Sequence, residues 1–162
     1  MSRDNSPDPS RHITMNDPHK LSRREISQVL TRWQRAWDDR DLDGVMDLFH
    51  DDVLYENWTG SRIRGKAALR RAWAPWFADP AGFRFIEEET FIDEARQKVL
   101  YRWRLEWPSP EPGCKGQPEC RRGVDILHFR DGRIIQKLTY SKTTINIAGQ
   151  PIRLQPSTRP EV

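Results

Sequence analysis

The sequence has few of the residues that build metal centres or disulfide frameworks. Only two cysteines, Cys114 and Cys120, occur among 162 residues, both in a stretch rich in proline and glycine. No histidine accompanies them at the spacing of a zinc site, so we predict no metal centre. We expect two free thiols; the alternative is a disulfide that closes the loop, which requires an oxidising compartment.

Long apolar runs and phosphate-binding motifs are also missing. No stretch approaches the roughly 20 apolar residues of a membrane helix, and the N-terminus has no apolar signal-peptide core. We therefore expect a soluble, cytoplasmic protein without a membrane partner. The sequence contains no glycine-rich phosphate loop and no nucleophile elbow, which gives no support to nucleotide or serine-hydrolase chemistry, and we predict no cofactor.

Neither sign of charge predominates. The chain holds 27 basic and 24 acidic residues, a net charge of +3, and the two kinds are interspersed. Because nucleic-acid binding needs basic residues gathered into a patch, we do not expect a nucleic-acid partner.

Aromatic residues are what the chain has in quantity. Seven tryptophans and six phenylalanines stand in a sequence of which only 36% is apolar. A chain of this length is expected to form one domain that buries most of its unfolded surface. The core should therefore be compact and rich in aromatic side chains.

The first part of the chain predicts a leader followed by two helices. Residues 1–20 show no apolar periodicity, and we expect a disordered leader there. The capping box Ser22–Glu25 opens an apolar stripe at helical spacing, which predicts a helix to about Asp39. A second, short helix is expected over residues 41–49.

The rest of the chain predicts one more helix and then strands. Gly65–Lys66 opens the helix, in which Pro75 should cause a bend or an early end. Asp131-Gly132 is a strong signal for a two-residue hairpin. We expect a tail over residues 148–162. The expected strands cover residues 53–58, 83–92, 97–107, 121–129 and 133–143.

This order of elements predicts an α+β fold. A strongly curved antiparallel sheet can wrap around three helices and enclose a hollow, whereas a flat sheet would leave the aromatic stripes unburied. We therefore expect a cone-shaped α+β barrel over residues 21–147.

The strand over residues 98–107 alternates oily and charged side chains. Its charged face holds Arg104 and Glu106, side by side, where the guanidinium can orient the carboxylate. We predict that this pair faces the hollow; an ordinary strand with one wet face is the alternative. Its other face, with Tyr101, Trp103 and Trp107, would then point outward. Because that face is too large to leave in water, we predict a homodimer through it.

Two blocks of sequence carry a family resemblance. The first runs from Trp33 to Asn57, ending in Leu48-Phe-His-Asp-Asp-Val-Leu-Tyr-Glu-Asn57, and is followed by Arg64-Gly-Lys66; the second is Asp125-Ile-Leu-His-Phe129 with Asp131-Gly-Arg-Ile134. In these blocks the chain resembles the nuclear transport factor two-like domains, which include SnoaL-like polyketide cyclases, ketosteroid isomerases and limonene epoxide hydrolases. The resemblance covers about residues 22–143. It implies the fold and pairing through the sheet, but no single reaction, because one scaffold hosts many activities.

The comparison with ketosteroid isomerases argues against their reaction. Those enzymes set a carboxylate base against an oxyanion hole made of a tyrosine and a protonated aspartic acid. Asp125 falls at the position of that aspartic acid, but Asn57 occupies the position of the base and Trp33 that of the tyrosine. Steroid isomerisation by that mechanism is therefore not expected.

The resemblance to limonene epoxide hydrolases extends further. In that family a tyrosine and an asparagine two residues apart hold a water, an arginine and an acidic residue two apart follow on a later strand, and an aspartate on the last strand activates the water. Tyr55 and Asn57 match the first pair, and Arg104 and Glu106 match the second in spacing. The activating aspartate falls at Thr139, which is no base at neutral pH, so another carboxylate would have to act.

These alignments bring polar groups from several strands into the hollow. Ionic groups are costly to bury and persist mainly when they are paired or used, which favours a functional pocket over a charge network that merely closes the cone. Trp33, Trp37 and Trp73 are expected in the wall of the pocket. The side chains expected to point inward are those of Tyr55, Asn57, Arg104, Glu106, Asp125, Lys137 and Thr139, with Lys137 and Thr139 contacting substrate.

The leading hypothesis is a cofactor-independent enzyme that performs epoxide hydrolysis, hydration or isomerisation on an apolar, oxygen-bearing small molecule. In the epoxide version, Glu106 protonates the leaving oxygen and Arg104 orients Glu106. Tyr55 and Asn57 position the water, and Asp125 accepts its proton. The alternative is a non-catalytic binding or interaction domain, which the threonine at the expected base position suggests.

Overall fold

The computed structural model describes residues 20–155. Apart from Lys20, the expected leader lies outside the described residues, and so does the expected tail beyond Gln155. Three helices and eight strands form the described part. Their bounds are α1 (Arg23–Asp38), α2 (Leu42–Asp47), β1 (Phe49–Glu56), β2 (Arg62–Arg64), α3 (Lys66–Phe77), β3 (Arg84–Asp93), β4 (Lys98–Pro108), β5 (Pro118–Arg130), β6 (Arg133–Ser141), β7 (Thr144–Ile147) and β8 (Gln150–Arg153).

Helix α1 begins at the predicted capping box. The backbone N–H of Glu25 donates to the Ser22 hydroxyl, and the Glu25 carboxylate accepts the backbone N–H of Ser22. Two of the free amides of the first turn are thereby satisfied. Helix α2 is also capped, because the Asp41 carboxylate accepts the backbone N–H of Gly44. The two caps fix where the helices that lead into the sheet begin.

Several element boundaries differ from those predicted; β5, for example, begins at Pro118 rather than Arg121. Helix α2 ends at Asp47, and β1 already begins at Phe49, which pairs with Ile134 of β6. The register shifts between Phe49 and Leu54, so the simple alternation that would have indicated a strand there is interrupted. After Ile147 the chain continues into β8, which pairs with β7 to form a small hairpin attached to β5.

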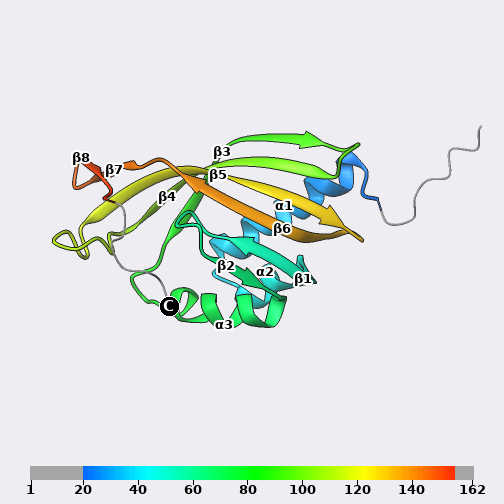
Figure 1. The fold of residues 1–162 in the computed structure, drawn as a ribbon, viewed down its shortest axis with the longest axis horizontal. Coiled ribbons are helices and arrows are strands. Elements are labelled where there is room, and N and C mark those ends of the chain that lie inside the picture. Colours follow the sequence, from blue (N-terminus) through cyan, green and yellow to red (C-terminus); the bar gives the residue numbers. More distant parts are fainter. Residues whose placement is uncertain (1–19, 156–162) are drawn as a thin grey trace, which may run out of the picture.

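The sheet curls around the helices. Its strand order is β2-β1-β6-β5-β4-β3, antiparallel throughout except for the parallel pair β1 and β6. Figure 1 shows the long strands β3 to β6 arching over α1, with α3 below β1 and β2. The predicted α+β fold with a curved sheet wrapped around three helices is confirmed. The expectation of a wholly antiparallel sheet is wrong, because β1 and β6 run parallel and the sheet is mixed. Among the described helices none is long and apolar enough to cross a membrane.

The inner face of β4 is the aromatic one. Tyr101 and Trp103 are 2% and 1% exposed, and Trp107 packs against the same core. The prediction that these residues point outward and form a dimer surface is wrong. They turn inward because α1 and α3 also present aromatic stripes, and the two sets of rings bury one another.

Candidate functional site

A cavity of about 260 Å³ lies between the helices and the inner face of the sheet. All seven tryptophans of the chain line it, including Trp33, Trp37 and Trp73, which are predicted from the sequence to lie in a pocket wall. Most of its lining is therefore aromatic. The predicted polar side chains that also line it are Tyr55, Asn57, Asp125, Lys137 and Thr139.

Asp125, Lys137 and Thr139 form a closed triangle of contacts, which we call the charged pole of the cavity. Lys137 Nζ lies 2.7 Å from Asp125 Oδ1 and donates to Thr139 Oγ1 at 2.6 Å. The Thr139 hydroxyl donates to Asp125 Oδ1 at 2.7 Å. The ladder of β5 and β6 makes them neighbours, because Asp125 stands opposite Thr139, and Lys137 precedes Thr139 by two residues on the same face.

Burial sets the electrostatics of this pole. Asp125, Lys137 and Thr139 are each no more than 5% exposed. Loss of hydration lowers the pKa of Lys137 below its ordinary 10.5, and the neighbouring Asp125 carboxylate offsets part of that shift by its charge and its hydrogen bond. Lys137 is thus a stronger proton donor than a surface lysine, held next to a carboxylate that can accept a proton.

Tyr55 supplies a neutral hydrogen-bond donor beside the charged pole. Lys137 Nζ lies 5.3 Å from the centre of the Tyr55 ring. The Tyr55 hydroxyl donates to Asn57 Oδ1 at 3.2 Å, and the same oxygen accepts the Trp58 backbone N–H at 2.7 Å. Burial, and then the negative charge of Asp125, raise the pKa of Tyr55 well above its ordinary value, so its hydroxyl keeps its proton at neutral pH.

Arg104 and Glu106 do not reach the cavity. They do form a pair, with Arg104 Nε 3.3 Å from Glu106 Oε1, but on the outer face of β4, where their side chains are 33% and 44% exposed. Tyr101 lies opposite Asp125 in the ladder of β4 and β5, so the odd-numbered residues of β4 share the face of Asp125 and the even-numbered ones point away. The prediction that this pair enters the hollow is wrong, and the structure gives no support to Glu106 as proton donor or Arg104 as its orienting cation.

Aromatic residues of β3 and β4, rather than Arg104 and Glu106, line the cavity on this side. Phe85, Tyr101, Trp103 and Trp107 all line the cavity. The Tyr101 hydroxyl donates to Gln34 Oε1 on α1, and burial raises the pKa of Tyr101. The sequence signal that identifies them is the coincidence of aromatic stripes on the helices and on β4, because two such stripes are most easily buried against each other.

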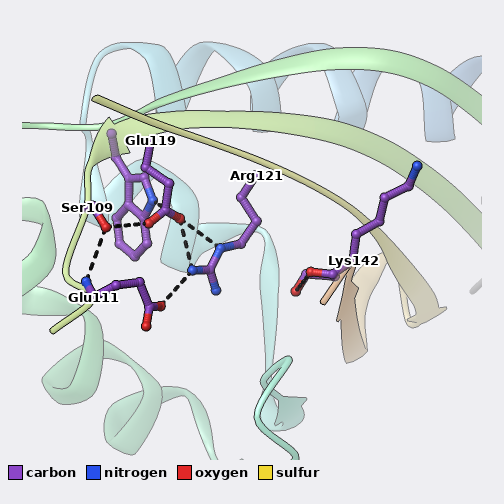
Figure 2. Close-up of polar contacts among 7 residues, drawn as sticks. Ser109, Glu111, Glu119, Arg121 and Lys142 are labelled. Atoms are coloured by element: carbon purple, nitrogen blue, oxygen red, sulfur yellow. Dashed lines mark hydrogen bonds and ion pairs between the residues drawn. The ribbon is translucent and has the colours of Figure 1, made fainter. Parts of the chain in front are cut away.

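A second polar cluster is buried beside the cavity wall (Figure 2). The sequence pattern does not single it out. Glu119 Oε1 accepts Arg121 Nε at 2.9 Å and Trp107 Nε1 at 2.8 Å, and its other oxygen accepts the Ser109 hydroxyl at 2.8 Å. The Arg121 guanidinium also pairs with Glu111 at 3.0 Å. We call Ser109, Glu111, Glu119 and Arg121 the Arg121 cluster.

The Arg121 cluster supports two cavity tryptophans. The Arg121 guanidinium carbon lies 4.9 Å from the centre of the Trp58 ring and 5.7 Å from that of Trp107, within the range of cation–π attraction. Arg121 and Glu119 are 2% and 3% exposed. Their only sequence signal is spacing, because they continue the two-residue step that leads back from Asp125 along β5.

No cluster of metal ligands accompanies the cavity. Among residues 20–155 no group of three or more histidine, cysteine, aspartate or glutamate side chains is placed to hold a metal ion. Cys114 and Cys120 are both free thiols. The cavity's own ionisable side chains are those of Asp125, Lys137, Tyr55 and Tyr101.

The fold and the cavity define the class of protein: an α+β domain whose curled sheet and helices enclose an aromatic hollow with buried charges. The sequence model of the SnoaL-like domain matches residues 30–137. The chain therefore belongs to the SnoaL-like family of nuclear transport factor two-like domains. No curated protein matches the sequence.

Solved structures share this fold. A protein of unknown function from Mesorhizobium loti is 25% identical, with a TM-score of 0.61 over 76% of this chain and 97% of its own. The Δ5-3-ketosteroid isomerase of a Mycobacterium species is 24% identical, with a TM-score of 0.63 over 76% of this chain and 98% of its own. A limonene epoxide hydrolase-like enzyme of M. tuberculosis is 21% identical, with a TM-score of 0.61 over 74% of this chain and 84% of its own. The fold is thus shared with proteins described as an isomerase and an epoxide hydrolase as well as with a protein of unknown function.

Proposed function

We propose that the protein is a cofactor-independent enzyme that performs acid–base chemistry on a compact, apolar, oxygen-bearing molecule. The observation that carries the proposal is the contact of a buried ammonium group and a buried carboxylate, Lys137 and Asp125, in the wall of an aromatic cavity. A proton donor and a proton acceptor held together out of water are what such catalysis needs.

The size and lining of the cavity support this substrate class. Its volume of about 260 Å³ is just below the roughly 300–1,000 Å³ common for ligand pockets. Tryptophan walls favour an apolar body, and the charged pole favours one oxygen function on it.

Epoxide opening illustrates how the charged pole would act. Lys137 donates a proton to the epoxide oxygen as its C–O bond breaks, and Asp125 accepts a proton from the water that forms the new C–O bond. The product is a diol, and Asp125 returns its proton to Lys137 across their 2.7 Å contact. Tyr55, whose hydroxyl would turn from Asn57 Oδ1 toward the substrate, would donate a hydrogen bond to the oxygen on which charge develops. In an isomerisation, Asp125 would instead take a proton from carbon while Lys137 stabilises the enolate.

The test is product formation by variants that remove each half of the pair. Incorporation of ¹⁸O from labelled water is measured over a panel of compact apolar epoxides, together with isomerisation of β,γ-unsaturated ketones of similar size. Asp125→Asn and Lys137→Met should each lower the rate about 10²- to 10⁴-fold. Glu106→Gln, on the outer face, is the matched control and should leave turnover unchanged. Full turnover by a folded Asp125→Asn variant would remove Asp125 from the mechanism.

A non-catalytic binding domain is the second candidate, and one observation favours it. Thr139 stands at the position where the resemblance to epoxide hydrolases places the activating aspartate, and its hydroxyl is occupied by Asp125 and Lys137. A binder would change its tryptophan fluorescence with members of the same panel and release no product. Product formation from any of them decides for the enzyme.

A further inference from the structure

Lys137 is the one lysine that the fold buries. The chain has six lysines, all within residues 20–155, and the other five are exposed or half-buried. The strand ladders enclose the backbone of Lys137, with Tyr55 of β1 on one side and Leu127 of β5 on the other. The surface that Lys137 contributes to the cavity wall therefore belongs to its side chain, which keeps 6% of its area accessible.

Every group close to the Lys137 amine also lines the cavity. Nζ lies 2.7 Å from Asp125 Oδ1, donates to Thr139 Oγ1 at 2.6 Å and lies 5.3 Å from the centre of the Tyr55 ring. Asp125, Thr139 and Tyr55 are all wall residues. An ammonium group has three N–H donors. In the described part of the chain two of them meet a partner, so one position on the nitrogen is left for a ligand.

The contact with Asp125 gives the amine a way to lose a proton inside the cavity. An ammonium group is no nucleophile, whereas a neutral amine is one, and desolvation in an apolar pocket is a known way to activate a lysine. Transfer of one proton across the 2.7 Å contact turns the ionic pair into an amine and a carboxylic acid. Exclusion of water favours these neutral forms, and burial lowers the pKa of Lys137 accordingly.

We propose that Lys137 is a nucleophile that forms a Schiff base with small aldehydes and ketones bound in the cavity. The inference rests on the proposed function only in taking this cavity as the ligand site. It narrows the substrate class from oxygen-bearing molecules in general to carbonyl compounds, and it adds a covalent step to the acid–base chemistry. The aromatic walls support such a step, because a site that excludes water protects an imine from hydrolysis.

The reaction needs only Lys137, Asp125 and the carbonyl compound. The neutral amine forms a bond to the carbonyl carbon, and the carbonyl oxygen takes the proton that Asp125 holds. Asp125 then removes a proton from the nitrogen and gives it to the new hydroxyl group, which leaves as water while the C=N bond forms. An ammonium group and a carbonyl compound thus give a protonated imine and one water, and Asp125 is again a carboxylate. The protonated imine weakens the adjacent C–H bond, and Asp125 is the base that can take that proton.

Reductive trapping on the full chain tests the proposal. Sodium cyanoborohydride reduces an imine to a stable secondary amine, so each lysine that has reacted keeps the probe as an added mass, which peptide mapping locates. The probes are acetone and cyclohexanone, and the exposed Lys98 in the same sample is the reference. We expect Lys137 to be labelled at least about tenfold faster than Lys98, because a ketone held in the cavity meets the amine at a high effective concentration.

Three controls separate the cavity from chance reactivity. In urea the cavity is lost, and Lys137 should be labelled no faster than Lys98. The preference for cyclohexanone over acetone should be larger at Lys137 than at Lys98, because the tryptophan walls favour the larger apolar ring. Lys137→Met should remove the rapidly labelled species from the intact protein, and Lys98→Met should keep it.

The outcomes separate this inference from the proposed function. Labelling of Lys137 no faster than Lys98 overturns the inference, and turnover of the epoxide and ketone panel by the same protein leaves the proposed function standing. Rapid labelling of Lys137 without any turnover supports the Schiff base and contradicts the proposed function. An advantage for Lys137 that persists in urea also overturns the inference, because the cavity is then not its cause. The main comparison uses the unaltered protein, so poor folding of a variant does not prevent the test.

Discussion

At the scale of single residues, Lys137 is a lysine held almost entirely out of water. Burial lowers its pKa, so between that lowered value and the ordinary 10.5 the unfolded chain binds more protons than the folded one. The contribution of Lys137 to the free energy of unfolding therefore rises with pH across that window and falls as the pH drops back through the lowered pKa.

An NMR titration tests this directly. We expect the Cε resonance of Lys137, assigned by its loss in Lys137→Met, to titrate below the ordinary lysine pKa of 10.5. The reason is the cost of keeping an ammonium ion out of water. A Lys137 midpoint at or above 10.5 would contradict the prediction.

Because Asp125 and Lys137 form a pair, replacing them singly and together should have different effects on the free energy of unfolding. Asp125→Leu or Lys137→Met alone leaves one ionic group buried without its partner, and should lower the free energy of unfolding by about 3–5 kcal/mol. The double variant removes both charges and should be more stable than either single variant. Urea unfolding of the four proteins gives the cycle. A double variant whose loss equals the sum of the two single losses would show that the groups are not coupled.

At the scale of elements, β5 carries a line of inward residues with unlike tasks: Glu119, Arg121, Gly123 and Asp125. Gly123→Ala should destabilise the protein by about 1–3 kcal/mol, because its Cβ meets the Tyr140 backbone oxygen as well as Trp103. Val124→Ala, at the next position on the outer face, is the control, and thermal unfolding of both is the measurement. A Gly123→Ala loss no larger than that of Val124→Ala would show that the ladder adjusts freely.

The elements also show what could be predicted from the sequence. The capping box at Ser22 and the turn at Asp131-Gly132 depend on residues a few positions apart, and both were predictable for that reason. The face of β4 was not. Alternation of oily and charged residues has the same pattern whichever side is turned inward, and only contacts with distant α1 and α3 decide it.

The same distinction, between what nearby residues determine and what distant contacts determine, applies to the candidate site. The inward placement of Asp125, Lys137 and Thr139 follows from resemblance to a family whose last strands are well defined, and the structure brings these residues together. Arg104 and Glu106 have the right spacing on the wrong face of β4. Spacing of two predicts that residues share a face, but it does not predict which face. The Arg121 cluster depends on a loop folding back, which no periodicity encodes.

At the scale of the whole molecule, the outer face of the sheet presents an apolar row of its own, in place of the aromatic face of β4 that was expected to point outward. Phe91, Leu100, Ile126 and Leu138 stand opposite one another across β3, β4, β5 and β6. Phe91 is 59% and Leu100 36% exposed. A contiguous apolar row on an otherwise charged surface is typical of an interface.

A second copy of the chain fits this row better than an unlike partner does. Residues of both signs flank it in the ladder of β3 and β4: Glu89 pairs with Arg102 on one side, and Asp93 with Lys98 on the other. Across a two-fold axis, each copy can therefore set its acidic residues against basic residues of the other, because such an interface uses the same patch twice. We predict a homodimer through this outer row.

Sedimentation velocity over a range of protein concentrations measures the association. Leu100→Glu puts a charge into the apolar row and should weaken the dimer at least about tenfold, because the carboxylate would have to lose its water without a partner. Ser27→Glu, on the exposed side of α1, adds the same charge away from the sheet and should leave the dimer intact. Monomer at every concentration of the unaltered protein would contradict the prediction, and so would a dimer that Leu100→Glu does not weaken, because the copies would then meet through some other surface.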